Sequence, residues 1–101
     1  MKTILQKIAS KQELLVNFYT TWCGTCNLLK PELEKFTRKY GELVEILEIN
    51  LDQDSHFISN FKIIRMPTLI FFRDGKEVWR KEGLVGAEEI YLLYEEMGSE
   101  I

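Results

Sequence analysis

The sequence contains few of the residues on which several classes of small protein depend. It has two cysteines, two prolines and a single histidine, His56. Two cysteines are too few for the disulfide scaffold of a small secreted domain. A structural zinc ion usually has four protein ligands, and neither a second cysteine pair nor a second histidine is available to complete such a set. We therefore predict no bound metal, and a zinc ion shared between two copies of the chain is the alternative that this count leaves open.

Long apolar runs and an excess of positive charge are also missing. No apolar run approaches the roughly 18 residues of a membrane-spanning helix. Lysines and glutamines interrupt residues 1–15, which therefore lack the continuous apolar centre of a signal peptide. The formal net charge is −3, whereas a nucleic-acid-binding domain carries a basic face. We expect a cytoplasmic protein that binds neither membranes nor nucleic acids.

What the sequence does contain fits one folded domain. It has 101 residues, of which 46% are hydrophobic and 29% charged, and these values are typical of a globular domain with one core. No linker, repeat, low-complexity segment or glycine-rich phosphate loop is visible. We predict a single domain over residues 1–101, a monomer, without a nucleotide, flavin or metal cofactor.

Hydrophobic spacing predicts an alternation of helices and strands. The apolar run at residues 13–19 is typical of a buried strand, and apolar residues at steps of three and four after Gly24 indicate an amphipathic helix. Pro31 is expected to kink that helix and Gly41 to end it. Asp74-Gly75 is a strong hairpin signal. The predicted elements are a helix at 2–10, a strand at 13–19, a helix from about 24, a strand at 43–51, a short helix capped by Asp54 or Ser55 and carrying Phe57, Ile58 and Phe61, strands at 68–73 and 76–81, and a helix at about 87–97.

This order of elements predicts an α/β fold. The first strand, the long helix and the second strand should form a parallel pair with a crossover, and the hairpin adds antiparallel strands. The expected result is a central mixed four-stranded sheet with helices on both faces. A fifth strand is the alternative, if residues 2–5 are extended rather than helical. With a helix there, the strand at 43–51 lies at a sheet edge, where Glu45 or Glu48 discourages pairing with other chains.

Both cysteines lie in the segment Trp22-Cys23-Gly24-Thr25-Cys26, between a predicted strand and the following helix. A thiol attacks a disulfide as the thiolate, and the unpaired N–H groups in the first turn of a helix favour negative charge. Cys23, at or just before that turn, is therefore the predicted nucleophile. Cys26, three residues further on, is the predicted resolving cysteine, and Gly24 leaves space for close approach.

Two buried, inert cysteines are the alternative interpretation of this pair. Neither Cys23 nor Cys26 lies on the predicted apolar face of the helix, so we expect neither cysteine to be a core residue. A Cys-x-x-Cys pair within an alternation of strands and helices favours redox chemistry.

Further motifs accompany the cysteine pair at consistent spacing from about Glu13 onward. They are Pro31, Asn50-Leu51-Asp52, Met66-Pro67-Thr68, Asp74-Gly75 and Gly83. With these motifs the sequence resembles the thioredoxin family. The resemblance implies a thioredoxin-like fold with a cis peptide bond before Pro67. It also implies that Pro67 lies against the two sulfurs and helps to keep metal ions away from them.

The resemblance also implies a shallow apolar groove for protein substrates, in which the backbone of Met66 pairs with an extended peptide. The residues expected to line it are Trp22, Gly24, Met66, Pro67, Gly83 and Leu84. Core filling is the alternative for Trp22, whereas Trp79 is expected to pack across the hairpin.

Three positions near the cysteine pair depart from the family pattern. Thr25 stands where the family usually has proline, which leaves the redox potential open and favours a value more oxidising than roughly −270 mV. Asn17 replaces a buried aspartate that helps to deprotonate the resolving cysteine, and an amide cannot accept that proton. Glu48 replaces the lysine that accompanies the aspartate. Either Glu48 supplies the missing base near Asn17, or it is a surface residue and water carries the proton.

These features predict a thioredoxin-like thiol–disulfide oxidoreductase. Cys23 attacks a disulfide in a protein substrate, Cys26 releases the reduced product, and a thioredoxin-reductase-type partner is expected to reduce the resulting disulfide. One alternative is an oxidant or isomerase of an extracytoplasmic compartment. The other is a thioredoxin-like binding module with little redox turnover.

Overall fold

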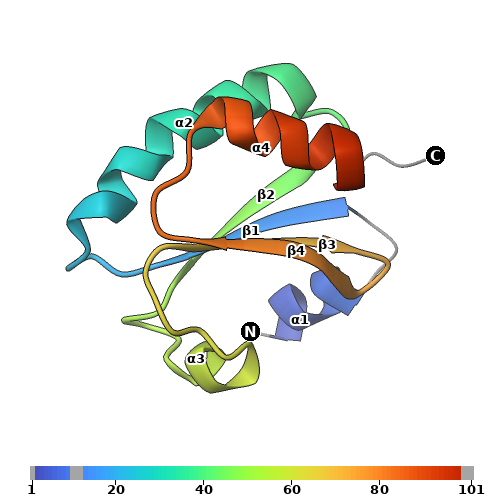
Figure 1. The fold of residues 1–101 in the computed structure, drawn as a ribbon. Coiled ribbons are helices and arrows are strands. Elements are labelled where there is room, and N and C mark those ends of the chain that lie inside the picture. The colour runs from blue at the N-terminus through green and yellow to red at the C-terminus, as the bar shows by residue number, and fades with distance from the viewer. Residues whose placement is uncertain (1, 10–12, 99–101) are drawn as a thin grey trace.

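Four strands form one mixed sheet with helices on both of its faces (Figure 1). The computed structural model describes residues 2–9 and 13–98. Helices α2 and α4 cover one face of the sheet, and α1 and α3 lie on the other. The elements in chain order are α1 (Lys2–Ala9), β1 (Glu13–Tyr19), α2 (Gly24–Tyr40), β2 (Glu45–Asn50), α3 (His56–Asn60), β3 (Thr68–Arg73), β4 (Lys76–Glu82), α4 (Ala87–Leu93) and the π-helical turn η1 (Tyr94–Gly98).

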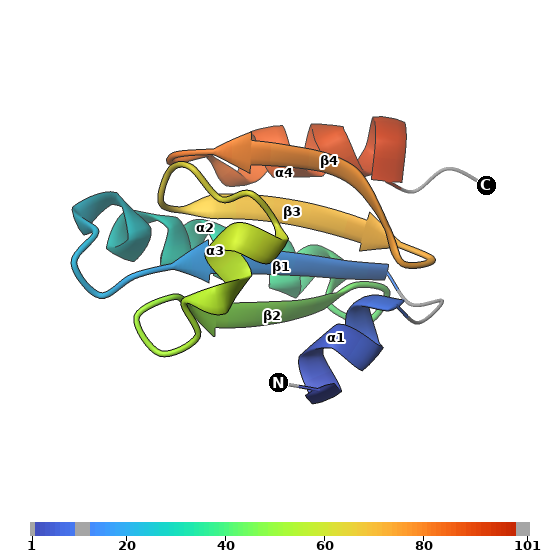
Figure 2. The same ribbon diagram turned by 90° about the horizontal axis from the view of Figure 1, so that it is seen from below.

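The strand order is β2-β1-β3-β4, so β1 and β3 are the central strands. β1 pairs in parallel with β2, whereas β3 pairs antiparallel with both β1 and β4 (Figure 2). Asp74 and Gly75 have φ angles of 55° and 79°, and positive φ at both central residues is what a type I′ hairpin turn requires. The predicted α/β fold with a mixed four-stranded sheet is confirmed. The alternative of a fifth strand at residues 2–5 is wrong, because these residues belong to α1.

The β2 strand is one edge of the sheet, as the prediction of an N-terminal helix requires. Glu45 forms an ion pair with Lys7 of α1, and Glu48 is exposed. Carboxylates on an edge strand disfavour pairing with the strand of another molecule. The expected role of Glu45 or Glu48 in discouraging such pairing stays a prediction.

Strand β1 is held between two apolar cores, because successive side chains of a strand point to opposite faces of the sheet. On the α2 and α4 side, Leu15 and Phe71 share a core with Leu29. On the opposite side, Val16 shares a core with Phe57 of α3. Full burial of an aliphatic or aromatic side chain stabilises a fold by about 1.5–3 kcal/mol. These two layers therefore fix β1 in the centre and determine where its carboxyl end, next to the cysteines, lies.

Several predicted boundaries differ from the structure. Strand β2 ends at Asn50 rather than at residue 51, and β4 ends at Glu82 rather than at residue 81. Strand β2 begins at Glu45 rather than at residue 43. The reason is that the amides of Leu43 and Val44 both donate to the carbonyl of Tyr40, and these bonds keep the chain in the turn that follows α2. The last predicted helix is shorter, since α4 ends at Leu93 and the chain continues as η1.

Other local predictions agree with the structure or remain open. Helix α2 contains Pro31 and has Gly41 as its C-cap, whereas the expected kink at Pro31 stays a prediction. Ser55 is the N-cap of α3, without a capping bond from its side chain. Trp79 stacks on Phe71, with ring centroids 5.8 Å apart, as expected for a residue that packs across the hairpin. The predicted first helix also included residue 10, which lies outside the described residues. Within the described ranges, no helix is both long enough and apolar enough to cross a membrane.

Candidate active site

Cys23 is the N-cap residue of α2, directly before the first helical residue. Its backbone is extended, with φ −91° and ψ 113°, and its Sγ accepts a hydrogen bond from the Cys26 amide at 3.1 Å. The first N–H groups of a helix have no partner within the helix, and they carry partial positive charge. The Sγ atom therefore takes the position of a capping oxygen, where a thiolate is favoured over a neutral thiol.

Cys23 and Cys26 form a disulfide in which the Cα atoms are 5.3 Å apart. Cys23 is half-buried, whereas Cys26 is only 6% exposed and lies on the buried face of α2 with Leu29. The expectation that neither cysteine belongs to the core is therefore wrong for Cys26. A target can reach the outer sulfur more easily than the inner one, and this asymmetry supports the predicted division into nucleophile and resolving cysteine.

The segment before β3 forms the wall opposite the cysteines. The Met66–Pro67 peptide bond is cis, as the resemblance implied, and the Met66 carbonyl oxygen lies 3.4 Å from the Cys23 Sγ. Pro67 is buried, and its carbonyl accepts a 2.7 Å hydrogen bond from the amide of Gly83, whose φ is +87°. Such a φ favours glycine. The structure thus brings the Met66–Pro67 segment to the cysteines and joins it to the end of β4.

Asp52 supports the loop that carries the nucleophile. One oxygen of its carboxylate accepts hydrogen bonds from the Thr21 hydroxyl at 2.6 Å and the Thr21 amide at 3.0 Å. These bonds hold the pKa of Asp52 below its ordinary value, and the bond from the Thr21 hydroxyl contributes more than the bond from the Thr21 amide. The Asp52 amide in turn donates to Asn50 Oδ1 at 2.9 Å. The motif Asn50-Leu51-Asp52 had drawn attention to this position, but the sequence did not indicate that it holds a loop 31 residues away.

Exposed apolar side chains occur in the segments that carry Cys23, Met66 and Gly83. Trp22 is 87% exposed and Leu84 is 49% exposed, so the alternative of core filling is wrong for Trp22. Ile64, two residues before Met66, is 82% exposed and had not been recognised as a candidate. The sequence could not distinguish Ile64 from its neighbour Ile63, which is buried. The geometry of the loop decides which of the two isoleucines is exposed. The lining of a substrate groove by these residues stays a prediction.

Thr25 and Gly24 lie in the first turn of α2, and both are exposed. The Thr25 Oγ1 lies 3.2 Å from the Cys23 Sγ. At Gly24 an added Cβ would meet no atom within 4 Å. Of the two residues between the cysteines, Thr25 is thus the one whose side chain contacts a sulfur.

Asn17 and Glu48 lie on the same side of the sheet, the side that α2 covers. Leu15 faces α2, and Asn17, two residues further along β1, faces the same way. Asn17 is 4% exposed, and nothing in the described part of the chain forms a hydrogen bond with its Oδ1. Glu48 is the register partner of Asn17 on β2 but is exposed. The structure therefore brings Glu48 next to Asn17, and the role of Glu48 as a base stays a prediction.

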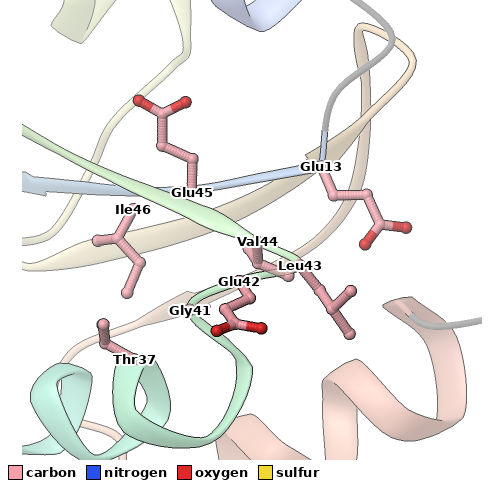
Figure 3. A pocket seen from close by; sticks show the side chains of 8 residues that line it. All are labelled: Glu13, Thr37, Gly41, Glu42, Leu43, Val44, Glu45 and Ile46. Carbon is pink, nitrogen blue, oxygen red and sulfur yellow. The ribbon is translucent and has the colours of Figure 1, made fainter.

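An open pocket of about 680 Å³ lies away from the cysteines (Figure 3). It is formed where β1 and β2 begin and α2 ends, while the cysteines follow the opposite end of β1. Its carboxylates do not converge, because Glu13 bonds to Arg73 at 3.0 Å and Glu45 pairs with Lys7 across β2. The lining residues are Glu13, Thr37, Gly41, Glu42, Leu43, Val44, Glu45 and Ile46. Among the residues that the structure describes, no group of three or more histidine, cysteine or acidic side chains is placed to hold a metal ion.

Sequence comparison identifies the family to which this site belongs. The family profile described as Thioredoxin matches residues 2–96. The chain belongs to the thioredoxin family. Thioredoxin relatives include chloroplastic thioredoxin X of Arabidopsis thaliana, 40% identical over 80 residues, and thioredoxin of Alicyclobacillus acidocaldarius, 33% identical over 85 residues.

The share of each relative's length that matches this chain differs among these thioredoxins. The match to thioredoxin X includes 77% of this chain but 44% of that protein, and the match to chloroplastic thioredoxin Y of Oryza sativa includes 80% and 48%. The chain thus spans less than half the length of these two curated relatives. For the Alicyclobacillus thioredoxin the corresponding shares are 84% and 81%.

Solved structures show the same thioredoxin fold. The thioredoxin of Malassezia sympodialis superposes with a TM-score of 0.83 at 23% identity, covering 93% of this chain and 83% of that one. Thioredoxin-2 of the malaria parasite, described as a component of its protein secretion machinery, gives a TM-score of 0.80 at 23% identity and covers 83% and 82%. Family membership and a Cys-x-x-Cys pair at disulfide distance together indicate thiol–disulfide oxidoreductase chemistry.

Proposed function

We propose that this protein reduces disulfide bonds in other proteins through a reversible Cys23–Cys26 dithiol–disulfide cycle. The placement of Cys23 carries the proposal, because its sulfur is the accessible member of the pair and accepts the Cys26 amide at a helix start. Both features favour a reactive thiolate. The thioredoxin family acts on protein disulfides, and this supports the choice of substrate class.

Each step of the proposed cycle exchanges one disulfide bond for another. The Cys23 thiolate attacks a target sulfur, the target disulfide breaks, and the released target thiolate takes up a proton. The Cys26 thiolate then attacks Cys23 in the mixed disulfide and expels the second target sulfur. Two electrons have passed to the target, which is now a dithiol, and the Cys23–Cys26 disulfide remains. A dithiol donor must return two electrons and two protons to close the cycle.

Reduction of insulin by dithiothreitol tests the proposal. The protein should accelerate the reduction catalytically, and Cys23→Ser should bring the rate to that of dithiothreitol alone. Cys23→Ser is a matched control, because it replaces a single sulfur atom by oxygen. A wild-type rate at this background level contradicts the proposal and favours a thioredoxin-like binding module.

Oxidation or isomerisation of disulfides is the second candidate function. The contact between the Thr25 hydroxyl and Cys23 favours it, because a hydrogen-bond donor at this sulfur stabilises the reduced form. A reduction potential between roughly −120 and −180 mV would support an oxidant or isomerase, whereas a value near −270 mV supports the reductase. The potential of the Cys23–Cys26 pair therefore decides the direction of electron flow.

The cellular setting of this activity remains a prediction. We expect a thioredoxin-reductase-type electron donor, a cytoplasmic location, a single domain and a monomeric protein. Reduction of the oxidised protein by a purified thioredoxin reductase and NADPH would test the first of these expectations.

A further inference from the structure

The chain leaves α3 through a turn that places a lysine in a left-handed backbone conformation. The amide of Ile63 donates to the Ile58 carbonyl at 2.8 Å. The amide of Lys62 donates to the Ser59 carbonyl at 3.3 Å, and these two bonds together form a Schellman motif. The φ of Lys62 is 53°, a conformation that glycine adopts at lower cost. The carbonyls of Phe61 and Lys62 are bonded from outside this turn.

Arg80 of β4 supplies hydrogen bonds to both of these carbonyls. Its guanidinium donates through Nη2 to the Phe61 carbonyl at 3.0 Å and through Nη1 to the Lys62 carbonyl at 3.3 Å. A guanidinium is always charged, and positive charge is favourable at the C-terminal end of a helix. The segment between α3 and β3 is thereby anchored to β4, beside which it runs (Figure 2).

A bulge in β4 allows Glu77 to orient this guanidinium. Residues three apart on a regular strand point to opposite faces of the sheet. The register with β3 shifts between Phe71 and Phe72, where Val78 is an extra residue in β4. Glu77 and Arg80 therefore point to the same face. The Glu77 carboxylate accepts hydrogen bonds from Nε at 2.7 Å and from Nη2 at 2.8 Å, and this two-point contact fixes the plane of the guanidinium.

The segment held in this way leads directly to the cysteines. It carries the exposed Ile64 and then Met66, whose carbonyl oxygen lies 3.4 Å from the Cys23 Sγ. Its other end is held by the Thr68 hydroxyl, which donates to the Arg65 carbonyl at 2.6 Å. A target sulfur that reaches Cys23 therefore comes to lie beside this segment. A protein target brings a chain of residues against it, whereas a small disulfide brings only its two sulfurs and their substituents.

We propose that Arg80 is a positioning residue for the reduction of protein disulfides, because it holds residues 63–66 in place beside Cys23. The proposal rests on the proposed function, since it concerns the step in which Cys23 attacks a target disulfide. Without the guanidinium, water bonds the carbonyls of Phe61 and Lys62 instead, and the segment loses its anchor at the α3 end. A protein target then meets the nucleophile in the correct arrangement less often, so the attack becomes slower.

Two substrates separate this role from a general weakening of the fold. The reduced protein is mixed with insulin or with hydroxyethyl disulfide, well below its melting temperature, and the second-order rate of its oxidation is measured. Arg80→Ala should lower the rate with insulin about tenfold, as expected for the loss of hydrogen bonds from a charged donor. The rate with hydroxyethyl disulfide should stay close to that of the wild type, because this small disulfide does not depend on the segment.

Two further variants show whether the geometry of the guanidinium is responsible. Arg80→Lys keeps the charge, but an ammonium cannot reproduce the planar fork that bonds two carbonyls and a carboxylate. It should therefore resemble Arg80→Ala. Glu77→Gln keeps an acceptor oxygen for the guanidinium without the negative charge, and it should lower the insulin rate only in part. An insulin rate that Arg80→Lys restores fully would show that charge alone is needed and would contradict the positioning role.

Lys62→Gly distinguishes positioning from stability. Glycine adopts the positive φ at this position at lower cost, so adding the change to Arg80→Ala should raise the melting temperature. The bonds from the guanidinium remain absent in the double variant, and its rate with insulin should stay low. Lys62→Gly alone should keep the wild-type rate, because Arg80 still bonds the carbonyl at this position. Recovery of the insulin rate in the double variant would show that Arg80 only stabilises the fold.

Failure of this proposal and failure of the proposed function give different results. A wild-type protein that does not reduce insulin contradicts the proposed function and, with it, the role of Arg80. A wild-type protein that reduces insulin, with Arg80→Ala either unchanged or slowed equally with both disulfides, contradicts only the role of Arg80.

Discussion

The outer and inner halves of the active site are built in different ways. The outer half consists of Trp22, Cys23, Thr25 and the Met66 carbonyl, and its sulfur receives two hydrogen bonds at the start of a helix. We call Cys26 the inner half, together with Asn17 of β1, which faces the same side of the sheet as α2; both residues are almost fully buried. There the Oδ1 of Asn17 has no hydrogen-bond partner among the described residues. Cys23 thus has polar support for attack, whereas no carboxylate among the described residues is buried and available for proton transfer at Cys26.

Removal of each sulfur in turn is expected to have the largest effect on activity, and it distinguishes the two halves most clearly. Cys23→Ser should abolish formation of a mixed disulfide with a target, and Cys26→Ser should trap it, because the second sulfur is needed for release. Turnover should fall by on the order of a thousandfold or more in both variants. Mass spectrometry after incubation with an oxidised target distinguishes them. Accumulation of the adduct in Cys23→Ser instead would show that the inner sulfur attacks.

A carboxylate at position 17 tests whether the inner half of the site is shielded from water. Asn17→Asp places an ionisable group in a buried position, and burial raises the pKa of a carboxyl group. The variant should match the wild type most closely below the unfolded pKa of about 3.9. It should lose stability as the pH rises towards the raised folded pKa, by roughly 1–4 kcal/mol at pH 8. Denaturant unfolding between pH 4 and pH 8 measures the loss.

Asn17→Leu is the matched control for this prediction. It removes the amide oxygen that lacks a partner, so it should leave the stability unchanged or increase it, without a dependence on pH. An Asn17→Asp protein that is as stable at pH 8 as at pH 4, relative to the wild type, would mean that water or a donor reaches this position.

The sequence predicted the outer half more completely than the inner half, for physical reasons. The outer half depends on local features, namely a strand that ends at Tyr19, a helix that begins at Gly24 and two cysteines at the junction. Periodicity reveals such features directly. The sequence analysis took Leu29 as the first residue of the apolar face of α2 and so did not predict the burial of Cys26. Cys26 lies three residues before Leu29 and therefore on the same face of the helix.

Contacts between distant segments had no local signal. Thr21 and Asp52 are 31 residues apart and meet only because β1 and β2 are parallel neighbours that end side by side. The boundary of β2 was likewise set by bonds from Leu43 and Val44 to the end of α2, not by their apolar character. Pairing of strands must be known before either feature can be derived.

Loss of the Asp52 carboxylate should weaken the outer half moderately. Asp52→Asn removes the negative charge of the group that accepts hydrogen bonds from the Thr21 hydroxyl and amide. We therefore expect a several-fold lower rate of insulin reduction and a lower melting temperature at pH 7. The pKa of Asp52 is lowered on folding, and its contribution to stability is therefore present above the unfolded pKa. This contribution disappears as the pH falls through the lower folded pKa. The melting temperatures of wild type and variant should thus converge in strong acid.

Thr21→Val provides the control for Asp52, since it removes the hydroxyl bond and keeps the amide bond. It should show part of the loss seen with Asp52→Asn. Melting temperatures of Asp52→Asn and wild type that differ equally at every pH would contradict a role of the charge.

Glu48 is expected to contribute least, although it lies beside Asn17 in the strand register. Its side chain is exposed at the sheet edge, so water competes for any proton that it would accept. Glu48→Gln should therefore leave the pH profile of insulin reduction unchanged, with Glu45→Gln as a second edge-strand control. Loss of activity confined to Glu48→Gln and to one limb of the profile would instead identify Glu48 as the base of the inner half. In that case a carboxylate on the neighbouring strand serves the buried cysteine, and the two halves of the site would differ less than their burial indicates.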